Sequence, residues 1–454
     1  MMWPFKKKPI TQLELTAERA IAPDGQFFIG HDVRRNQPVL LSEASMARSV
    51  VMLGQAGSGK TSLQLLVAFQ QIQRGGGLAF VQGHAEDDTL QSLWEFACLC
   101  GREKDLLVLN ADHPDKGNSY NPVMSGTPGQ IADRCMLVMP PGGSPGAEFY
   151  RNEARQHLVR VTSCLQEAGL AFNLSDLAIL TSHRQALVEL VDKAEAAAPQ
   201  GPAAAALRDW LELVVTSSAH LKALLGGLAG RLAQLGFGRM AAVLGDYQPE
   251  IDFASAIQSN KIIYIGLPAM GKNAHQLAFN RMLIADLQAA YEKTKAPAGD
   301  GHQEVPFLRL IEDTAFDAAS TGGVMQSLRY SSDALDSMPN VGVMMVFKLG
   351  AEQELTAAAS LVGLDDQAGR DQIRALQLGQ FILHAPAAKS AVHVQAPRLS
   401  IQGSKRADFG SPRPNKTPKR VTEGAAFHLE IERYLRLSCA DTHFDATEVA
   451  VSTH

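Results

Sequence analysis

The sequence has no apolar run long enough to cross a membrane: no stretch reaches the ~18 to 20 uninterrupted apolar residues that a spanning helix requires. Cysteines number 5 in 454 residues, an odd count without metal-ligand spacing, which favours reduced thiols in a cytoplasm. Lys and Arg total 42 against 47 Asp and Glu, and this net charge of -5 argues against a surface coated for nucleic acid. We therefore expect a soluble globular protein whose contacts with DNA, if any, are local.

Other catalytic signatures are also missing. The 13 histidines form no metal-ligand pair with a third ligand nearby, so we expect no zinc site. The chain also has no internal repeat of about 20 to 50 residues. With 46% hydrophobic residues, the chain is able to bury a large core and is expected to form at least two domains.

The strongest feature that is present is a glycine-rich segment that fits the phosphate-binding pattern G-x-x-x-x-G-K-[ST]. It follows the apolar run Val50-Val51-Met52-Leu53 and precedes residues 62–68, whose apolar positions have helical spacing. Glycines let the N–H groups of such a loop turn inward around a polyphosphate, at the positive end of the next helix. The sequence predicts a nucleotide site made of Gly54, Gln55, Ala56, Gly57, Ser58, Gly59, Lys60, Thr61 and Ser62.

Two residues of this segment have predicted chemical roles. Lys60 is expected to reach the outer phosphates of ATP. The Thr61 hydroxyl is placed to hold Mg²⁺, a hard ion that prefers oxygen ligands. ATP and Mg²⁺ are therefore the expected cofactors.

Strands and helices alternate after this loop. Residues 78–81 and 106–109 read as buried strands, and residues 90–100 as a helix between them, which is typical of a parallel sheet with crossovers. From about Glu153 to Gly245 the pattern becomes helical throughout, and we expect an inserted all-α domain there. Within it, Ser175 is predicted to cap one helix whose apolar stripe runs from Leu177 to Ala194. Strands resume at residues 261–265, 306–311, 341–347 and 380–383.

The order of these pieces resembles the type IV secretion coupling proteins, hexameric pumps related to the HerA and FtsK DNA-translocating ATPases. The resemblance covers roughly residues 26 to 395. Besides the phosphate loop, it rests on Phe27-Phe28-Ile29-Gly30-His31, Pro38-Val39-Leu40-Leu41, Asn118-Ser119-Tyr120-Asn121-Pro122, the segment 247–265 and the closing segment 376–383. The N-terminus lacks the membrane helices that are usual in this family.

The resemblance implies a RecA-like P-loop NTPase, an α/β fold with a mostly parallel central sheet, interrupted by the all-α domain. The expected parts are an N-terminal segment 1–25, the nucleotide-binding domain in two pieces (26–150 and 249–398), the all-α domain 151–248, and a basic flexible linker with a docking tail, 399–454. It also implies a homo-hexamer or mixed ring that works with secretion components on DNA or protein substrates. Such a protein would be cytoplasmic and reach the inner face of a bacterial membrane only through a partner.

The acidic site departs from the family pattern. A P-loop ATPase needs an Asp at a strand end for the Mg²⁺ shell, commonly followed by a Glu that activates water, whereas Glu312-Asp313 gives these in reverse order. We assign Glu312 to the Mg²⁺ shell and Asp313 to water activation, and expect slow or absent turnover as a real alternative. The pair could instead be an acidic turn after a buried strand.

Three further positions follow from the resemblance. Arg329 is a candidate for the arginine that reaches a neighbouring subunit's nucleotide. The glutamine that senses the γ-phosphate is expected near the end of the strand 341–347, where the chain has Phe347-Lys348. Residues 81–86, Val-Gln-Gly-His-Ala-Glu, stand where the family often carries an Asp and a Lys.

Two functional classes remain open on the sequence. The first is an ATP-driven motor of a type IV secretion or conjugation apparatus, of which a soluble HerA/FtsK-like DNA translocase is a variant. The second is a nucleotide-binding scaffold of the secretion complex with little hydrolysis.

Overall fold

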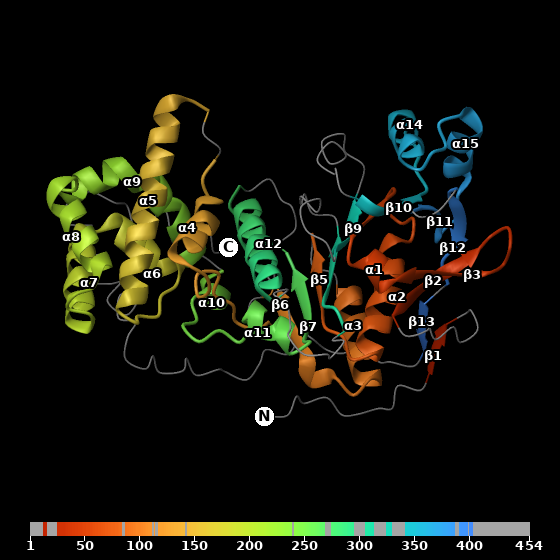
Figure 1. The fold of residues 1–454 in the computed structure, drawn as a ribbon, viewed down its shortest axis with the longest axis horizontal. Coiled ribbons are helices and arrows are strands. Elements are labelled where there is room, and N and C mark those ends of the chain that lie inside the picture. Colours follow the sequence, from red (N-terminus) through yellow and green to blue (C-terminus); the bar gives the residue numbers. More distant parts are fainter. Residues whose placement is uncertain are drawn as a thin grey trace, which may run out of the picture. The chain divides into compact units, whose positions relative to one another are not determined.

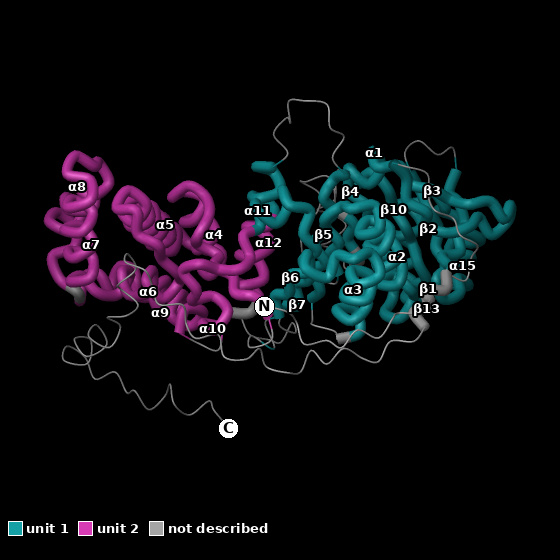
Figure 2. Tube along the Cα trace, turned by 90° about the horizontal axis from the view of Figure 1, so that it is seen from below, with its two compact units in different colours: residues 1–116, 253–270, 288–411 teal, residues 117–252, 271–287, 412–454 magenta. Residues whose placement is uncertain are grey.

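The computed structural model describes residues 12–15, 25–83, 87–110, 113, 117–140, 143–237, 240–267, 274–294, 305–312, 324–328, 341–385, 390–397 and 399–402. The chain divides into two compact units, shown in different colours in Figure 2. One unit comprises Met1–Lys116, Phe253–Met270 and Gln288–Ser411, and the other Gly117–Asp252, Gly271–Leu287 and Pro412–His454. We call them the sheet unit and the helical unit. The segment 151–248 proposed as an all-α domain lies inside the helical unit.

The strands of the described residues belong to the sheet unit. They are β1 (Gln12–Leu15), β2 (Gln26–Asp32), β3 (Pro38–Ser42), β4 (Ser49–Leu53), β5 (Leu78–Gln82), β6 (Leu106–Asn110), β7 (Ile262–Gly266), β8 (Leu308–Glu312), β9 (Val324–Leu328), β10 (Val341–Phe347), β11 (Gln380–His384), β12 (Val392–Gln395) and β13 (Leu399–Gln402). Figure 1 labels all of them except β4 and β8. The described helices of this unit are α1 (Glu43–Met46), α2 (Lys60–Gln73), α3 (Asp87–Leu99), the short 3₁₀ turn η1 (Glu103–Asp105), α11 (Phe253–Gln258), α14 (Glu352–Leu361), α15 (Gln367–Ala375) and residues 288–294 of α12 (Ala274–Thr294).

The main sheet has 11 strands in the order β3-β2-β12-β11-β10-β4-β9-β8-β5-β7-β6. Every neighbouring pair from β10 to β6 is parallel, whereas the pairs from β3 to β10 are antiparallel. β1 and β13 form a separate antiparallel pair. The predicted α/β fold with a mostly parallel centre is therefore confirmed, and an antiparallel extension is added on one side.

Alternate residues of the central strands serve two apolar cores, because successive side chains of a strand point to opposite faces. On β4, Val50 and Met52 pack with α2 and α3. Val51 and Leu53 pack instead with α14 and α15. The phosphate-loop strand is thus covered by helices on both faces, which is why it reads as an unbroken apolar run.

The helical unit contains α4 (Pro128–Met136), α5 (Pro145–Glu167), α6 (Leu174–Ser182), α7 (Arg184–Ala197), α8 (Pro202–Leu213), α9 (Ser218–Gly236), α10 (Ala241–Leu244) and residues 274–287 of α12 (Ala274–Thr294). Among the helices of the described ranges, none combines the length and apolar character that crossing a bilayer demands.

The prediction of one helix capped by Ser175 is wrong. Asn173 is the N-cap of α6, and its side chain accepts hydrogen bonds from the N–H groups of Ser175 and Asp176. The Ser175 hydroxyl donates to the Gly236 carbonyl at 2.6 Å instead. His183 separates α6 from α7, so the apolar stripe belongs to two helices. Period alone could not reveal this break, because the stripe continues on both sides.

Candidate nucleotide site

The glycine-rich segment connects β4 to α2, as predicted. α2 begins at Lys60, and its N-cap is Gly59, with φ at 105°. Gly57 also has positive φ, 72°. Both angles lie in the region that side chains other than glycine rarely adopt, which explains the glycines of the motif.

Backbone just before β11 and just after β10 holds the loop in place. The Gly379 N–H donates to the Ser58 carbonyl at 3.0 Å, and the Gln55 N–H donates to the Lys348 carbonyl at 3.0 Å. A Cβ atom on Gly59 would lie only 3.0 Å from the backbone of Gly379. The loop is therefore packed directly against backbone that precedes β11 and follows β10.

Lys60 is buried under this loop. Its ammonium group donates to the carbonyls of Gly54 at 2.8 Å and Gln55 at 3.0 Å. The Ser58 hydroxyl is also buried, and no hydrogen bond to it is found among the described residues. Buried polar groups of this kind are usually paired, so the loop carries donors that suit an anionic ligand.

The end of β8 meets the start of α2 beside the loop. Glu312 is the last residue of β8 and is 8% exposed. The Thr61 hydroxyl donates a hydrogen bond to Glu312 Oε1. The Gln82 side-chain amide donates to Glu312 Oε2 at 2.8 Å. In the parallel register of β5 and β8, Gln82 lies directly opposite Glu312, so both side chains end at one edge of the sheet.

Gln64 ties the helix to this edge. Its side-chain amide donates to the carbonyls of Ile311 and Met325, each at 3.1 Å. These carbonyls belong to β8 and β9, so one α2 residue fixes the helix over both strands. The position of Thr61 relative to Glu312 is therefore set by more than their own contact.

The oxygen atoms at this edge of the sheet are suitable ligands for a hard cation. A hydroxyl has one hydrogen to donate and two lone pairs to offer. Because the Thr61 hydroxyl donates its hydrogen to Glu312, the lone pairs of its oxygen remain able to bind a metal ion. Oxygen ligands next to an anion-binding loop are what Mg²⁺ with a polyphosphate requires.

Two predicted site residues, Asp313 and Arg329, lie outside the described residues. Sequence reasoning noted Gln82 only as a departure from the family pattern and did not predict its contact with Glu312. The sequence offered no local signal for that contact, because it depends on the register of β5 and β8.

The strand expected to end near the sensor glutamine lies beside β4. Val341–Phe347 forms β10, as predicted, but β10 flanks β4 on the side away from β8. The strand between β4 and β8 is β9, which the sequence analysis missed. It carries the fully buried Gln326. Gln326 and Ser327 interrupt the apolar pattern of this strand, so the pattern does not reveal it.

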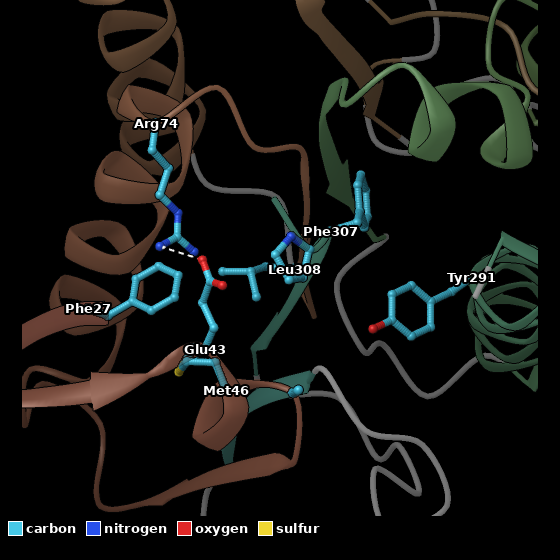
Figure 3. Close-up of a pocket in the computed structure, with 9 residues that line it drawn as sticks. Phe27, Glu43, Met46, Arg74, Tyr291, Phe307 and Leu308 are labelled. Carbon is cyan, nitrogen blue, oxygen red and sulfur yellow. Dashed lines mark ion pairs between the residues drawn. The ribbon is translucent and has the colours of Figure 1, made fainter. Parts of the chain in front are cut away.

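An enclosed cavity lies at the far end of α2 and does not belong to this site. Figure 3 shows Arg74, the C-cap of α2, paired with Glu43 at 3.0 Å beside Phe27 and Leu308. The volume of this cavity is about 10 Å³, which is room for about one water molecule. A helix of 14 residues separates it from the phosphate loop by about 20 Å.

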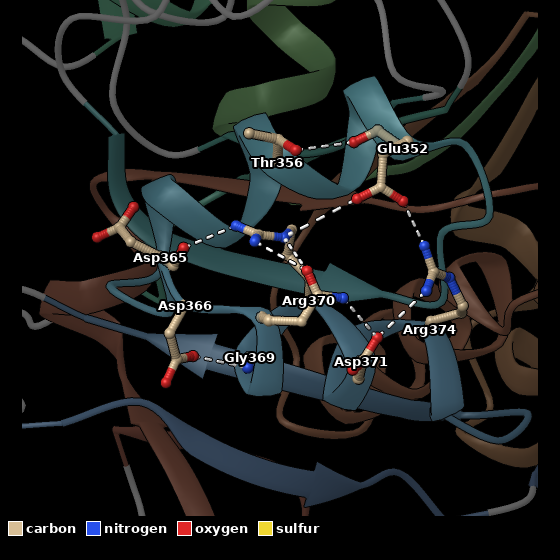
Figure 4. Close-up of polar contacts among 9 residues, drawn as sticks. Glu352, Thr356, Asp365, Asp366, Gly369, Arg370, Asp371 and Arg374 are labelled. Atoms are coloured by element: carbon tan, nitrogen blue, oxygen red, sulfur yellow. Dashed lines mark hydrogen bonds and ion pairs between the residues drawn. The ribbon is translucent and has the colours of Figure 1, made fainter.

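Two arginines lie on α15, which follows α14 and precedes β11. In Figure 4, Arg374 pairs with Glu352 of α14 and, at 3.2 Å, with Asp371. Arg370 donates to the Asp365 carbonyl at 2.7 Å. These contacts join α14 to α15 at the surface, and they occupy both guanidinium groups within the chain.

A phosphate loop between β4 and α2, with an acidic residue at the end of β8 two strands away, is the arrangement of a RecA-like P-loop fold. No family model matches the chain. The type 4 coupling protein DotL of Legionella pneumophila is 21% identical over 141 residues, which are 29% of this chain and 18% of DotL. The matched part is therefore less than a fifth of that relative's length.

Solved structures match over most of the chain. Plasmid coupling protein TrwB, in complex with ADP and Mg²⁺, superimposes with a TM-score of 0.54 at 13% identity, covering 86% of this chain and 91% of that one. VirB4 of Thermoanaerobacter pseudethanolicus gives 0.51 at 11% identity, covering 83% and 97%. The chain thus has the fold of the type IV secretion coupling proteins, as the resemblance predicted.

Proposed function

We propose that the chain is an ATP-binding and ATP-hydrolysing motor of a type IV secretion or conjugation apparatus. The observation that carries the proposal is the contact between Thr61 and Glu312, which joins the phosphate loop to the acidic end of β8. This arrangement is the one that a P-loop ATPase needs for Mg²⁺ and the terminal phosphates. One of the similar structures, plasmid coupling protein TrwB, is a complex with ADP and Mg²⁺, which supports the choice of ligand.

Each site residue has a proposed role. The N–H groups of residues 54–62 bind the phosphates, and Lys60 exchanges its two carbonyl partners for phosphate oxygens. Thr61 holds Mg²⁺, and Glu312 belongs to the Mg²⁺ shell, where it orients the Thr61 hydroxyl. Mg²⁺, when bound, neutralises charge on the phosphates. Asp313 activates the attacking water, and Arg329 acts on the nucleotide of a neighbouring subunit.

The proposed assembly is a homo-hexamer or mixed ring that acts with secretion components. Its substrates are DNA, protein or both, and it reaches the inner side of a bacterial membrane through a partner. Coupling proteins and VirB4 have the same fold, which supports this choice over an unrelated P-loop function.

The test is an ATPase assay with and without single-stranded and double-stranded DNA, with particle size measured in parallel. A motor hydrolyses ATP, DNA stimulates the rate, and Lys60→Ala abolishes it. A control variant, Lys222→Ala, changes an exposed helical-unit lysine and should leave the rate unchanged. Nucleotide binding without turnover at any DNA concentration would identify the scaffold instead. Absence of any affinity for ATP or ADP would refute both.

A further inference from the structure

The side-chain amide of Gln82 is fixed by three hydrogen bonds. Its nitrogen donates to Glu312 Oε2 at 2.8 Å and to the Thr89 hydroxyl at 3.1 Å. Its oxygen accepts from the Tyr264 hydroxyl at 2.9 Å. Gln82 and Tyr264 are each 1% exposed. Turning this amide would break all three bonds in a place that water does not reach.

Chemistry settles which way the amide faces. An ionised carboxylate only accepts hydrogen bonds, so the nitrogen of Gln82 must face Glu312. The oxygen of Gln82 then faces Tyr264, whose hydroxyl must donate. A chain of donors therefore runs from Tyr264 through Gln82 to Glu312, while Thr61 donates to the other carboxylate oxygen.

The strand register explains how Tyr264 reaches Gln82. In the β5 and β7 pair, Phe80 lies opposite Tyr264, and Gln82 lies opposite Gly266. Tyr264 and Gln82 are diagonal neighbours on one face of the sheet, a separation that a long aromatic side chain can span. Gly266 has no side chain to stand between them.

Glu312 is one methylene longer than the aspartate that usually occupies such a strand end, and a longer side chain has more rotamers to lose. A donor on the adjacent strand removes this freedom. A carboxylate in place of Gln82 would repel Glu312 at the same distance. The amide at position 82 is therefore matched to the glutamate at position 312.

We propose that Gln82, oriented by Tyr264, is a positioning residue that holds the Glu312 carboxylate against the Thr61 hydroxyl and so sets how strongly Mg²⁺ increases the affinity for ATP. This inference rests on the proposed function. Gln82 touches neither nucleotide nor metal in it and acts only through Glu312. The residue that binds the metal remains Thr61.

The test measures ATP affinity twice for each variant, once with Mg²⁺ and once with EDTA, and reports the ratio of the two dissociation constants. Partners that orient a metal ligand typically matter 10–100-fold, so Gln82→Leu should lower the ratio by about that factor. Tyr264→Phe keeps the buried ring and should lower it about 3–10-fold. Gln82→Glu, which is nearly isosteric, should lower it at least as far as Gln82→Leu.

The affinity in EDTA separates positioning from damage to the fold. It depends on the phosphate loop and should stay within about 2-fold of the unchanged chain in every variant. Tyr247→Phe is the matched control, since it removes a tyrosine hydroxyl that bonds Asp176 at 3.2 Å in the helical unit. It should leave the ratio unchanged. Tyr264→Phe added to Gln82→Leu should cause no further loss, because both changes act along one chain of donors.

Three results decide the matter. If the unchanged chain binds ATP with a Mg²⁺-dependent gain and that gain falls in the two single variants, the inference holds. If the gain persists in Gln82→Leu and Tyr264→Phe, Gln82 is not a positioning residue, although the proposed function stands. If the unchanged chain binds no nucleotide, the proposed function fails and this inference fails with it.

Discussion

Two buried carboxylates, one in each unit, are held in different ways. Asp286 in the helical unit accepts hydrogen bonds from the hydroxyls of Tyr120 at 2.8 Å and Ser125 at 3.2 Å, and it forms an ion pair with the buried Arg134. Glu312 in the sheet unit accepts from uncharged groups, the Thr61 hydroxyl and the Gln82 amide.

The two carboxylates differ in the groups that these contacts come from, a charged guanidinium for Asp286 and an uncharged hydroxyl and amide for Glu312. Burial raises the pKa of Asp286, and Arg134 acts against that rise. The pair is complete within the chain, which is typical of a structural site. Glu312 accepts hydrogen bonds from the uncharged Thr61 hydroxyl and Gln82 amide beside the phosphate loop. In the proposed function, Mg²⁺ on Thr61 supplies positive charge nearby. Replacing Asp286 should therefore lower the stability of the fold, whereas replacing Glu312 should lower the affinity for ATP with Mg²⁺.

The largest effect is expected from Asp286→Asn. It leaves the Arg134 guanidinium buried without its carboxylate, which typically costs about 3–5 kcal/mol in the free energy of unfolding. Urea denaturation of the full chain measures the loss. The double variant Asp286→Leu with Arg134→Met, which removes both charges, should recover most of it. If Asp286→Asn costs less than about 1 kcal/mol, the ion pair with Arg134 does not stabilise the fold and Asp286 does not differ from Glu312 in this way.

Glu312→Gln should act on ligand affinity instead. The Mg²⁺-dependent gain in ATP affinity should fall about 10–100-fold, since an uncharged amide no longer orients Thr61 toward a cation. The free energy of unfolding should change less than in Asp286→Asn, because the Gln amide can still accept the hydrogen bonds that the uncharged Thr61 hydroxyl and Gln82 amide donate. Isothermal titration and urea denaturation check the two numbers. A large loss of stability with an unchanged Mg²⁺ response would reverse the roles assigned to the two carboxylates.

His157 extends the comparison to a buried group whose ring nitrogens have no hydrogen bond among the described residues. It packs on Trp210, with ring centroids 5.2 Å apart. Burial, assisted by the charge of Arg160, lowers the pKa of His157 from 6.5 to about 3. The unfolded chain therefore takes up the proton first as pH falls.

The stability from His157 is full above its unfolded pKa and is lost as pH falls toward its folded pKa. Lowering the pH from 7 to 5 should cost about 2 kcal/mol. His157→Phe should flatten this dependence in urea denaturation at several pH values. His220→Gln, a change at an exposed position, is the control and should leave the slope as it is.

The smallest change in the free energy of unfolding is expected for a carboxylate that forms ion pairs at the surface. Glu352 pairs with Arg374 and Arg370, but its side chain is 62% exposed. Glu352→Gln should lower the free energy of unfolding by about 0.2–1 kcal/mol, and less at high salt. Thermal unfolding at two salt concentrations measures this. A loss as large as that of Asp286→Asn would show that burial does not decide the outcome.

Much of the sheet could be predicted from the sequence. The strands expected at residues 78–81, 106–109, 261–265, 306–311, 341–347 and 380–383 all exist, with ends shifted by at most two residues. Each is a short apolar run between polar turns, a local signal. β9 was missed because Gln326 interrupts its apolar pattern, and the break between α6 and α7 was missed because both helices share one apolar stripe.

The sequence by itself determined the phosphate loop, because its strand, glycines and helix start are set by interactions among about 20 consecutive residues. The tertiary structure alone decided that Thr61 meets Glu312, 251 positions further along the chain. It also decided that Gln82 and Tyr264 support that contact. Such contacts between residues far apart in the sequence depend on strand order and register. The packing of the whole sheet determines both, and no local pattern encodes them.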